Sequence, residues 1–367
     1  MSKRYLNLVS YFAEGVKIVV SDSNSRPATV VQRATIRDVA ARAGVSVTTA
    51  SRALNETGRM SDETRLRVQQ VAKELDYRPN SMARGLVQQR SFTLGLLTDD
   101  TYGRFTLPVA AGLSSAMTDR GVSVFLSAGE KEPKRMQLNL RAMEEKRVDG
   151  LVITGKRIDR QLPVDVSKLG MPVVYVYSKC PQGSIGFVPD DFNAAKNATQ
   201  HLINLGRRKI VHITGLSSFE AAHLRKAGWL EALDENGLAP FAEAIFGNWT
   251  EEHGYKTAYG LFESGADRPD AIFCGNDQIA RGVVDAFAHM GIKVPDDIAI
   301  VGFDNWEVFA KATRPPLTTV DMGLTCLGKS AGLALLDMIE GKPIESGLRK
   351  LNCRLVVRQS CGGEASE

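Results

Sequence analysis

From residue 91 to about residue 358, short apolar segments alternate with longer helical segments along the chain. The segments expected to form strands are Thr93–Leu97, Val122–Ser127, Gly150–Thr154, Val173–Val176, Ile185–Val188, Lys209–Thr214, Ala271–Cys274 and Ala299–Gly302. Helices are expected over residues 108–120, 134–147, 191–205, 221–236, 252–264 and 277–290. This alternation predicts doubly wound parallel sheets with helices on both faces. The number of these strand–helix units is enough for two such sheets, each forming one lobe. The two lobes would face each other across a cleft, where sheets of this kind bind ligands.

The charge of the chain is unevenly distributed over its 367 residues, which are too many for one ordinary domain. Residues 33–90 carry 11 Lys and Arg against 6 Asp and Glu, whereas residues 91–367 carry 31 against 34. A surface that contacts phosphate groups needs such a positive excess, although a solvated basic face would have the same composition. Charge alone therefore leaves the role of the N-terminal module open.

The cysteines and histidines give no sign of a disulfide framework or a metal site. The five cysteines are scattered without a CxxC pair, and the five histidines form no HxxxH pair. No nucleophile elbow, phosphate-cradling glycine loop or dinucleotide fingerprint is present. We therefore expect no metal, no cofactor and no enzymatic activity.

The N-terminus superficially resembles a signal peptide, but Glu14 and Lys17 interrupt its apolar run. No stretch of about 20 apolar residues occurs, so no membrane span is expected. We interpret residues 1–34 as a poorly ordered extension and expect the protein to be cytoplasmic.

Residues 35–55 predict two short helices joined by a tight turn. Thr35 can cap a helix over Ile36–Ala43, and Gly44 turns the chain toward a second helix over Val47–Leu54, which Ser46 can cap. A third helix is expected from Ser61 to near Tyr77. The apolar faces of the three helices would form one small core that contains Ile36, Val39, Ala40, Ala43, Val45, Ala50, Ala53, Leu54, Val68, Val71, Ala72 and Leu75.

The second helix would present a polar outer face of a kind that fits the major groove of DNA. Val47, Thr48 and Arg52 are the candidates for contacts with base edges, because Arg can bond guanine in a bidentate manner. The candidates for phosphate contacts are Thr35, Ser46, Thr49, Ser51, Asn55 and Tyr77. Ordinary helix capping and a simple surface charge are the alternatives for these residues.

The segment after this module, Asn80-Ser-Met-Ala-Arg-Gly-Leu-Val-Gln, could form one short helix with Leu86 exposed. It is too short to be stable alone. Together with residues 35–55 and the Tyr77-Arg-Pro-Asn80 link, this segment resembles the headpiece and hinge of the lactose repressor (LacI) family. In that family, paired hinge helices insert leucines into the minor groove and kink the DNA. The resemblance assigns this role to Asn80, Ala83, Arg84 and Leu86.

Gly85 departs from the serine that is commoner in the family at this position. By helix propensity, this glycine weakens the hinge helix by roughly 0.5 kcal/mol or less. The hinge would then become ordered only on operator DNA.

The resemblance extends to about residue 358 and implies a periplasmic-binding-protein-like sensor. The chain would cross between lobes near residues 190 and 320, and a last strand near Leu351–Val357 would return. The implied organisation is an extension (1–34), a helix-turn-helix headpiece (35–79), a hinge and linker (80–90), an effector-binding core (91–358) and a tail (359–367). Within the core, the N-lobe would hold about 91–190 and 321–350, and the C-lobe about 191–320 and 351–358.

Polar and aromatic residues at strand ends are the candidates for contacts with the effector. They are Asp100, Tyr102, Phe105, Asp191, Phe219, Arg225, Trp249, Asn276 and Asp304. Charged groups and an amide can bond hydroxyls, and an indole can stack on a sugar ring, so these residues suit a polyol. Phe219 stands where the family often has a smaller polar residue, so no particular sugar is expected.

These features predict a ligand-responsive, sequence-specific DNA-binding repressor controlled by a sugar or related polyol. No leucine heptads follow Arg358, so we expect a homodimer on a near-palindromic operator rather than a tetramer. A corepressor-type regulator that senses a nucleobase or another metabolite uses the same parts and stays open. An exported solute-binding protein would explain the two lobes but not residues 35–90.

Overall fold

The computed structural model describes residues 34–363 apart from residues 56, 78–84, 86–89, 130–131 and 264–266. The chain divides into two compact units, residues 1–80 and 81–367. No helix among the described residues is long and apolar enough to cross a membrane.

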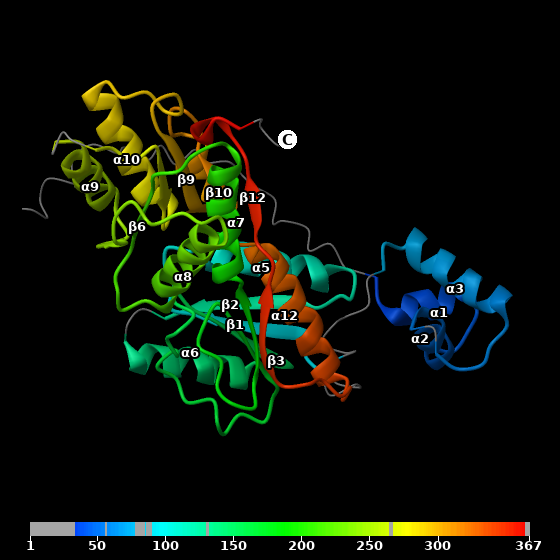
Figure 1. Ribbon diagram of the computed structural model, residues 1–367. Helices are drawn as coiled ribbons and strands as arrows, with labels where there is room; N and C mark the ends of the chain where they lie inside the picture. Colours follow the sequence, from blue (N-terminus) through cyan, green and yellow to red (C-terminus); the bar gives the residue numbers. More distant parts are fainter. Residues whose placement is uncertain are drawn as a thin grey trace, which may run out of the picture. The chain divides into compact units, whose positions relative to one another are not determined.

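The first unit is a three-helix module of α1 (Ile36–Ala43), α2 (Val47–Leu54) and α3 (Asp62–Glu74), shown in blue in Figure 1. Thr35 donates its backbone N–H and its hydroxyl to Asp38 at the start of α1, at 2.7 and 2.8 Å. The predicted turn is confirmed, since Gly44 has φ +65° after α1 and Ser46 Oγ accepts from Thr49 N. The third helix ends at Glu74, slightly earlier than predicted.

The core of this module contains the predicted apolar residues. Eight side chains are buried, and Ile36, Val45, Leu54, Met60, Leu75 and Tyr77 pack against them; the buried ones are Val39, Ala40, Ala43, Ala50, Ala53, Val68, Val71 and Ala72. Because five of these eight buried residues are alanines, the helices lie close together and leave their polar faces outside.

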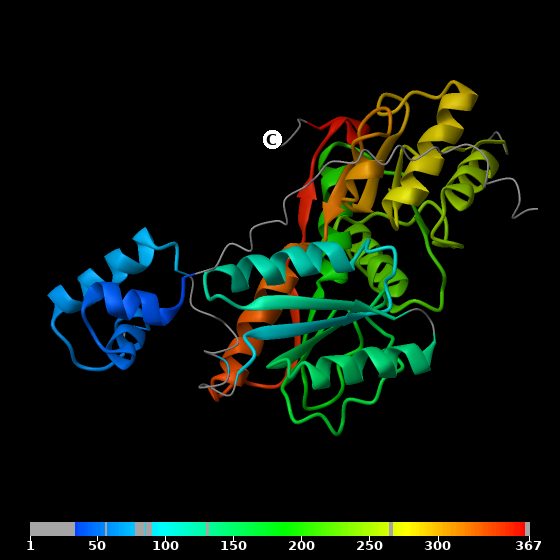
Figure 2. The same cartoon turned by 180° about the vertical axis from the view of Figure 1, so that it is seen from behind.

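The first sheet of the second unit has the strand order β11-β5-β4-β3-β1-β2, with every pair parallel. Its strands are β1 (Thr93–Thr98), β2 (Ser123–Ala128), β3 (Gly150–Thr154), β4 (Val173–Val176), β5 (Ile185–Pro189) and β11 (Gly347–Leu351). The helices of this N-lobe are α5 (Thr106–Thr118), α6 (Pro133–Glu145) and α12 (Leu324–Ile339). Figure 2 shows α5 along one face of the sheet and α6 on the other.

The second sheet has the order β12-β10-β9-β8-β6-β7, parallel except where β12 pairs with β10. Its strands are β6 (Ile210–Thr214), β7 (Ile245–Phe246), β8 (Ala271–Cys274), β9 (Ala299–Asp304), β10 (Thr318–Asp321) and β12 (Arg354–Val356). The helices of this C-lobe are α7 (Asp191–Asn204), α8 (Glu220–Glu235), α9 (Glu251–Glu263), α10 (Asp277–Met290) and α11 (Glu307–Ala310). The predicted fold class of two doubly wound lobes is confirmed.

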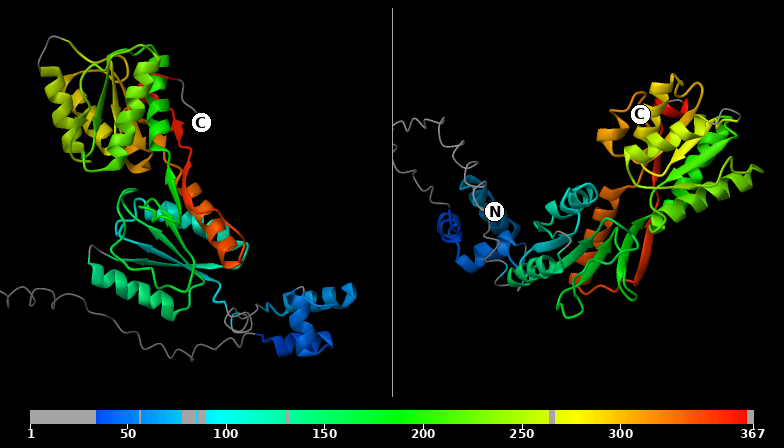
Figure 3. Two further views of the ribbon diagram at one scale, coloured as in Figure 1. Left: turned by 60° about the horizontal axis from the view of Figure 1, so that its bottom comes forward. Right: turned by 90° about the vertical axis from the view of Figure 1, so that its left-hand side faces the viewer.

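Three segments cross between the lobes, after β5, after β10 and after β11 (Figure 3). The last strand expected near residues 351–357 corresponds to β12, which pairs with β10 at the edge of the second sheet. The strand before it, β11, adds to the edge of the first sheet and was not predicted. The helix over 324–339 and the short strands β7 and β10 were not among the predicted elements.

Helices α5 and α12 pack side by side through glycines (Figures 1 and 2). A Cβ atom at Gly112 would lie 1.9 Å from the carbonyl oxygen of Thr325, and one at Gly328 would lie 2.1 Å from that of Val109. Only glycine permits this approach of the two backbones.

The tail expected after Arg358 begins within the C-lobe. Gln359–Cys361 form a short 3-10 helix (η2), and Ser360 and Cys361 are buried. Ser360 Oγ donates to the carbonyl of Ile300 at 2.7 Å and accepts from Thr318 N at 2.8 Å. These bonds to β9 and β10 make the segment part of the lobe.

Candidate functional site

The outer face of α2 carries the side chains that the sequence singled out for DNA contact. Val47 is 44% exposed, and Thr48 and Arg52 are exposed as well. The alkyl part of Arg52 packs against Gly58, where a Cβ atom would lie 3.1 Å from Arg52 Cδ. This contact supports the side chain but leaves its guanidinium group available.

The predicted phosphate-contacting residues flank this face and are partly engaged with one another. The hydroxyls of Ser46 and Thr49 lie 2.8 Å apart, and Asn55 Nδ2 donates to Ser51 Oγ at 3.4 Å. Burial raises the pKa of the Tyr77 hydroxyl. The hinge candidates Asn80, Ala83, Arg84 and Leu86 lie outside the described residues.

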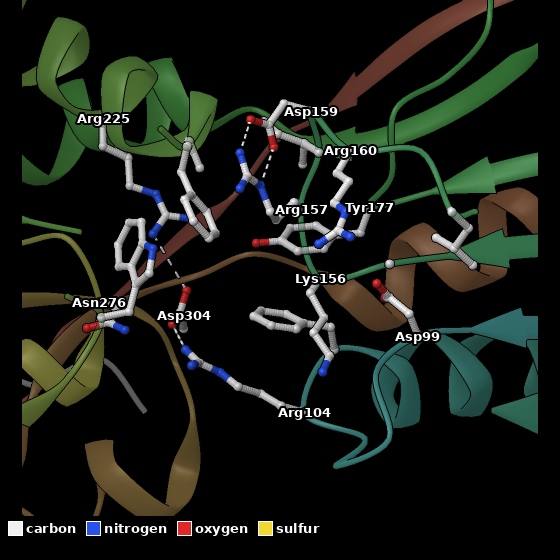
Figure 4. Close-up of a pocket in the computed structure, with 17 residues that line it drawn as sticks. Asp99, Arg104, Lys156, Arg157, Asp159, Arg160, Tyr177, Arg225, Asn276 and Asp304 are labelled. Atoms are coloured by element: carbon white, nitrogen blue, oxygen red, sulfur yellow. Dashed lines mark hydrogen bonds and ion pairs between the residues drawn. The ribbon is translucent and has the colours of Figure 1, made fainter. Parts of the chain in front are cut away.

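A pocket of about 290 Å³ lies between the two lobes of the second unit (Figure 4). The N-lobe contributes Asp99, Arg104, Phe105, residues 155–160, Leu162 and Tyr177, and the C-lobe contributes Phe219, Ala221, Arg225, Trp249, Asn276 and Asp304. Most of these residues follow the carboxyl ends of strands, as expected for parallel sheets.

Aromatic rings from both lobes form much of the pocket wall. Phe105 stacks on Tyr177 with ring centroids 4.8 Å apart, and Phe219 meets Trp249 edge-on at 5.7 Å. Gly215 makes room for the indole, because a Cβ atom there would lie 1.9 Å from Trp249 Cε2. Burial raises the pKa of Tyr177 to about 12, so its hydroxyl is protonated at neutral pH.

Arg225, in α8, is fixed by buried partners on one side and faces the pocket on the other. Its Nε donates to Asp191 Oδ1 at 2.7 Å and its Nη1 to the carbonyl of Gly275 at 2.5 Å, and both charged side chains are almost fully buried. Burial raises the pKa of Asp191, and the Arg225 guanidinium opposes that shift. Arg225 Nη1 also lies 3.8 Å from Asp304 Oδ1.

Asp304 ends β9 in a turn whose backbone is unusual for residues other than glycine. Asp304 has φ +109° and Asn305 has φ +50°, values that cost of order 1–3 kcal/mol each and that cluster at ligand sites. Two hydrogen bonds of the Asn305 side chain hold this turn in place. Its Oδ1 accepts from Arg358 Nη2 at 2.8 Å, and its Nδ2 donates to Asp321 at 3.1 Å. These bonds fix the carboxylate of Asp304 at the pocket wall.

Arg104, in the loop after β1, connects the two lobes at this point. It pairs with Asp304 and donates to Gln278 Oε1 at 3.0 Å. Its guanidinium also lies 4.6 Å from the ring centroid of Trp306. Figure 4 shows Arg104 and Arg225 approaching Asp304 from two sides.

Two family models match the chain: that of the bacterial regulatory proteins of the lacI family, over residues 35–80, and that of the periplasmic binding protein-like domain, over residues 199–361. The HTH-type transcriptional repressor CytR of Escherichia coli is 30% identical over 329 residues, which cover 89% of this chain and 96% of that protein.

The chain belongs to the LacI family.

Other LacI-family relatives have comparable similarity. The HTH-type transcriptional repressor PurR of Erwinia tasmaniensis is 34% identical over 331 residues, covering 89% of this chain and 96% of that protein. The ribose operon repressor of Halalkalibacterium halodurans is 33% identical over 335 residues, covering 91% and 99%. These relatives are named as transcriptional repressors and not as enzymes, and this chain is a LacI-family transcriptional regulator.

Solved structures show the same LacI-family fold. The lac repressor dimer bound to operator and the anti-inducer ONPF matches with a TM-score of 0.69 and 28% identity over 90% of this chain and 99% of that one. The complex of the transcriptional regulator CelR with cellobiose matches with a TM-score of 0.60 and 28% identity over 89% of this chain and 100% of that one.

Within this LacI-family sensor, six of the nine predicted effector residues line the pocket: Phe105, Phe219, Arg225, Trp249, Asn276 and Asp304. The other three do not. Tyr102 is 92% exposed, and Asp191 lies behind Arg225. Asp100 Oδ2 accepts from the backbone N–H groups of Phe105 and Thr106, so this carboxylate orders the start of α5.

Several residues that line the pocket were missed in the sequence. They are Asp99, Arg104, residues 155–160, Leu162, Tyr177 and Ala221. The segment Gly155-Lys-Arg-Ile-Asp-Arg160 directly follows the strand β3, so the same strand-end argument that selected Asp304 would have selected it.

Proposed function

We propose that this LacI-family regulator is a homodimeric repressor that binds a near-palindromic operator and responds to a sugar or related polyol. The observation that carries this proposal is the combination of two surfaces in one chain. One is the exposed polar face of α2, and the other is the pocket between the lobes, with aromatic walls and fixed polar groups.

On the DNA side, Val47, Thr48 and Arg52 would contact base edges in the major groove. The residues proposed to bond phosphates and fix the register are Thr35, Ser46, Thr49, Ser51, Asn55 and Tyr77. The hinge residues Asn80, Ala83, Arg84 and Leu86 would enter the minor groove, where the leucines of two subunits kink the duplex.

On the effector side, a ring would lie between the aromatic walls. Asp304, fixed by its turn, and Asn276 would bond its hydroxyls, and Arg225 would add a charge-assisted bond. Because the two lobes contribute separate groups, a bound ligand favours the lobe orientation in which all of them reach it. A coupling of only ~1–3 kcal/mol between this equilibrium and operator affinity makes a switch.

A nucleobase is the second candidate, and a specific feature favours it. The pocket offers two aromatic pairs, Phe105 with Tyr177 and Phe219 with Trp249, and a carboxylate on Asp304 that can accept from a ring N–H. The ribose operon repressor and the transcriptional repressor PurR are similar to this chain to about the same degree, so overall similarity does not identify the effector.

The test uses the full-length protein and a pool of random duplexes. We expect selection to enrich one near-palindromic sequence, whose binding stoichiometry is two chains per duplex by analytical ultracentrifugation. A panel of sugars, polyols and nucleobases is then screened by thermal shift, since a ligand of the folded state raises its melting temperature. A ligand from the panel should change operator affinity. If no sequence is preferred over random competitor, with or without these compounds, the proposal is wrong.

A further inference from the structure

The loop from Lys156 to Arg160 gives one end of the pocket an unusual concentration of positive charge. Among the residues that line the pocket, five are cationic (Arg104, Lys156, Arg157, Arg160 and Arg225) and three are carboxylates (Asp99, Asp159 and Asp304). Figure 4 shows Lys156, Arg157 and Arg160 among the side chains that line the pocket. A pocket built for an uncharged sugar has no need of this excess.

Three of the cations already have fixed carboxylate partners. Arg225 is paired with Asp191, and Arg104 with Asp304. The charges of the loop from Lys156 to Arg160 are not part of these two pairs.

The third pair lies within the loop. Arg157 donates to both oxygens of Asp159, at 2.9 and 2.6 Å. Lys156 and Arg160 then remain, and neither forms an ion pair with any residue that the structure describes. Both cations act on Asp99, because burial raises the pKa of that carboxyl and the charges of Lys156 and Arg160 lower it.

The loop is held in place by the opposite lobe. Arg157 Nη2 donates to the carbonyl of Ser218 at 2.5 Å, and its guanidinium lies 3.7 Å from the ring centroid of Phe219. Asp159 Oδ2 accepts from Glu220 N at 3.2 Å, at the start of α8. Both oxygens of Asp159 are thus engaged, and Lys156 and Arg160 project from a loop that is anchored on both sides of the cleft.

We propose that the effector is an anionic sugar or polyol derivative, carrying a phosphate or a carboxylate, and that Lys156 and Arg160 bind this group. The inference rests on the proposed function, because it takes this pocket as the effector site. The guanidinium of Arg160 can bond a phosphate or a carboxylate through two N–H groups, and Lys156 adds a point charge. The hydroxylated part of the ligand reaches Asp304 and Asn276 between the aromatic walls.

The test compares matched neutral and anionic compounds by isothermal titration calorimetry of the full-length protein. The pairs are ribose with ribose 5-phosphate, glucose with glucose 6-phosphate and with glucuronate, and inosine with inosine monophosphate. We expect at least one anionic member to bind about tenfold or more tightly than its neutral parent, and added salt to reduce this preference. The phosphate and carboxylate arms show which group the pocket takes.

Three double variants locate the effect. The variant K156Q/R160Q should lose most of the preference for the anionic member. The control K134Q/R141Q removes the same charge from exposed positions of α6 and should keep the preference. The variant K156R/R160K keeps the charge of the loop and should retain most of the preference.

Three results would overturn the inference: equal or tighter binding of the neutral parents, no binding of any anionic member at millimolar concentration, or an unchanged preference in K156Q/R160Q. If the neutral parents bind at least as tightly and alter operator affinity, this inference is overturned and the proposed function stays intact. Loss of sequence preference on DNA would instead overturn the proposed function.

Discussion

Asp277, the first residue of α10, is a carboxyl group with no exposed surface. Its Oδ2 accepts from Trp306 N at 2.7 Å, and its Oδ1 accepts from the hydroxyl of Thr319 at 2.5 Å. Burial raises its pKa from 3.8 to about 7, although these hydrogen bonds and the charges of Arg104 and Arg358 oppose the shift. The folded protein therefore holds a proton at this site more tightly than the unfolded chain does.

The sign and size of the effect on stability follow from this difference in pKa. The stability that Asp277 contributes by binding its proton more tightly in the folded state is fully present below pH 3.8, and it is lost as the pH rises to about 7. One pKa unit corresponds to 1.36 kcal/mol. A shift of about three units therefore lowers the free energy of unfolding by at most about 4 kcal/mol at pH 8. An asparagine at this position carries no charge, so it removes the cost of burying an ionised carboxylate at high pH. Its amide keeps the shape of the side chain, accepts from Trp306 N and donates to Thr319.

We therefore predict that D277N is more stable than the parent protein at pH 8 by ~2–4 kcal/mol, and that the difference shrinks toward pH 5. The assay is urea unfolding of both proteins at several pH values, followed by fluorescence. The control is D285N, which removes a half-exposed carboxylate from the same helix. Parallel pH dependence of D277N and the parent would refute the reasoning, whatever the absolute stabilities.

Three further predictions concern the other parts of the molecule. The variant R52A should cost ~1–3 kcal/mol of operator binding and relax base preference at one position, as measured by selection from randomised operators; equal weakening on every sequence would contradict base contact. The variant G215A should displace the indole of Trp249 and weaken effector binding about tenfold or more by calorimetry. The control G170A has no atom within 4 Å of the new methyl group and should bind normally. Burial lowers the pKa of His212 to about 3, so its contribution to stability is lost as the pH falls from 6.5 toward 3; H212Q should flatten acid unfolding over this range, and an unchanged acid midpoint would count against this.

The parts of the fold that could be predicted from the sequence are those with strong local patterns. The helix bounds of α1 and α2 were predicted to the residue, because Thr35, Gly44 and Ser46 mark them with capping and turn chemistry. The strands β3, β4 and β8 were predicted equally well, because each is a short apolar run between polar segments.

The elements that were missed depend on tertiary contacts. Helix α12 contains two glycines, which lower its helix propensity, and these glycines pack closely against α5. Strand β7 has only two residues, so it shows no period. The interruption between β11 and β12 arises because the chain leaves one sheet for the other, and no local signal records that change.

The residues of the candidate site that were missed also depend on tertiary contacts. Asp304 could be predicted because it stands at the end of a predicted strand, and Trp249 because an indole can stack on a ring. Arg104 could not, since its importance comes from Asp304, which lies 200 residues later and in the other lobe. The loop at Lys156 follows a predicted strand and could have been selected on that ground, but its bonds to Ser218 and Glu220 in the other lobe leave no local signal. The charge of the pocket therefore depends on contacts between segments that are distant in the sequence, and the class of effector has to be argued from the assembled pocket.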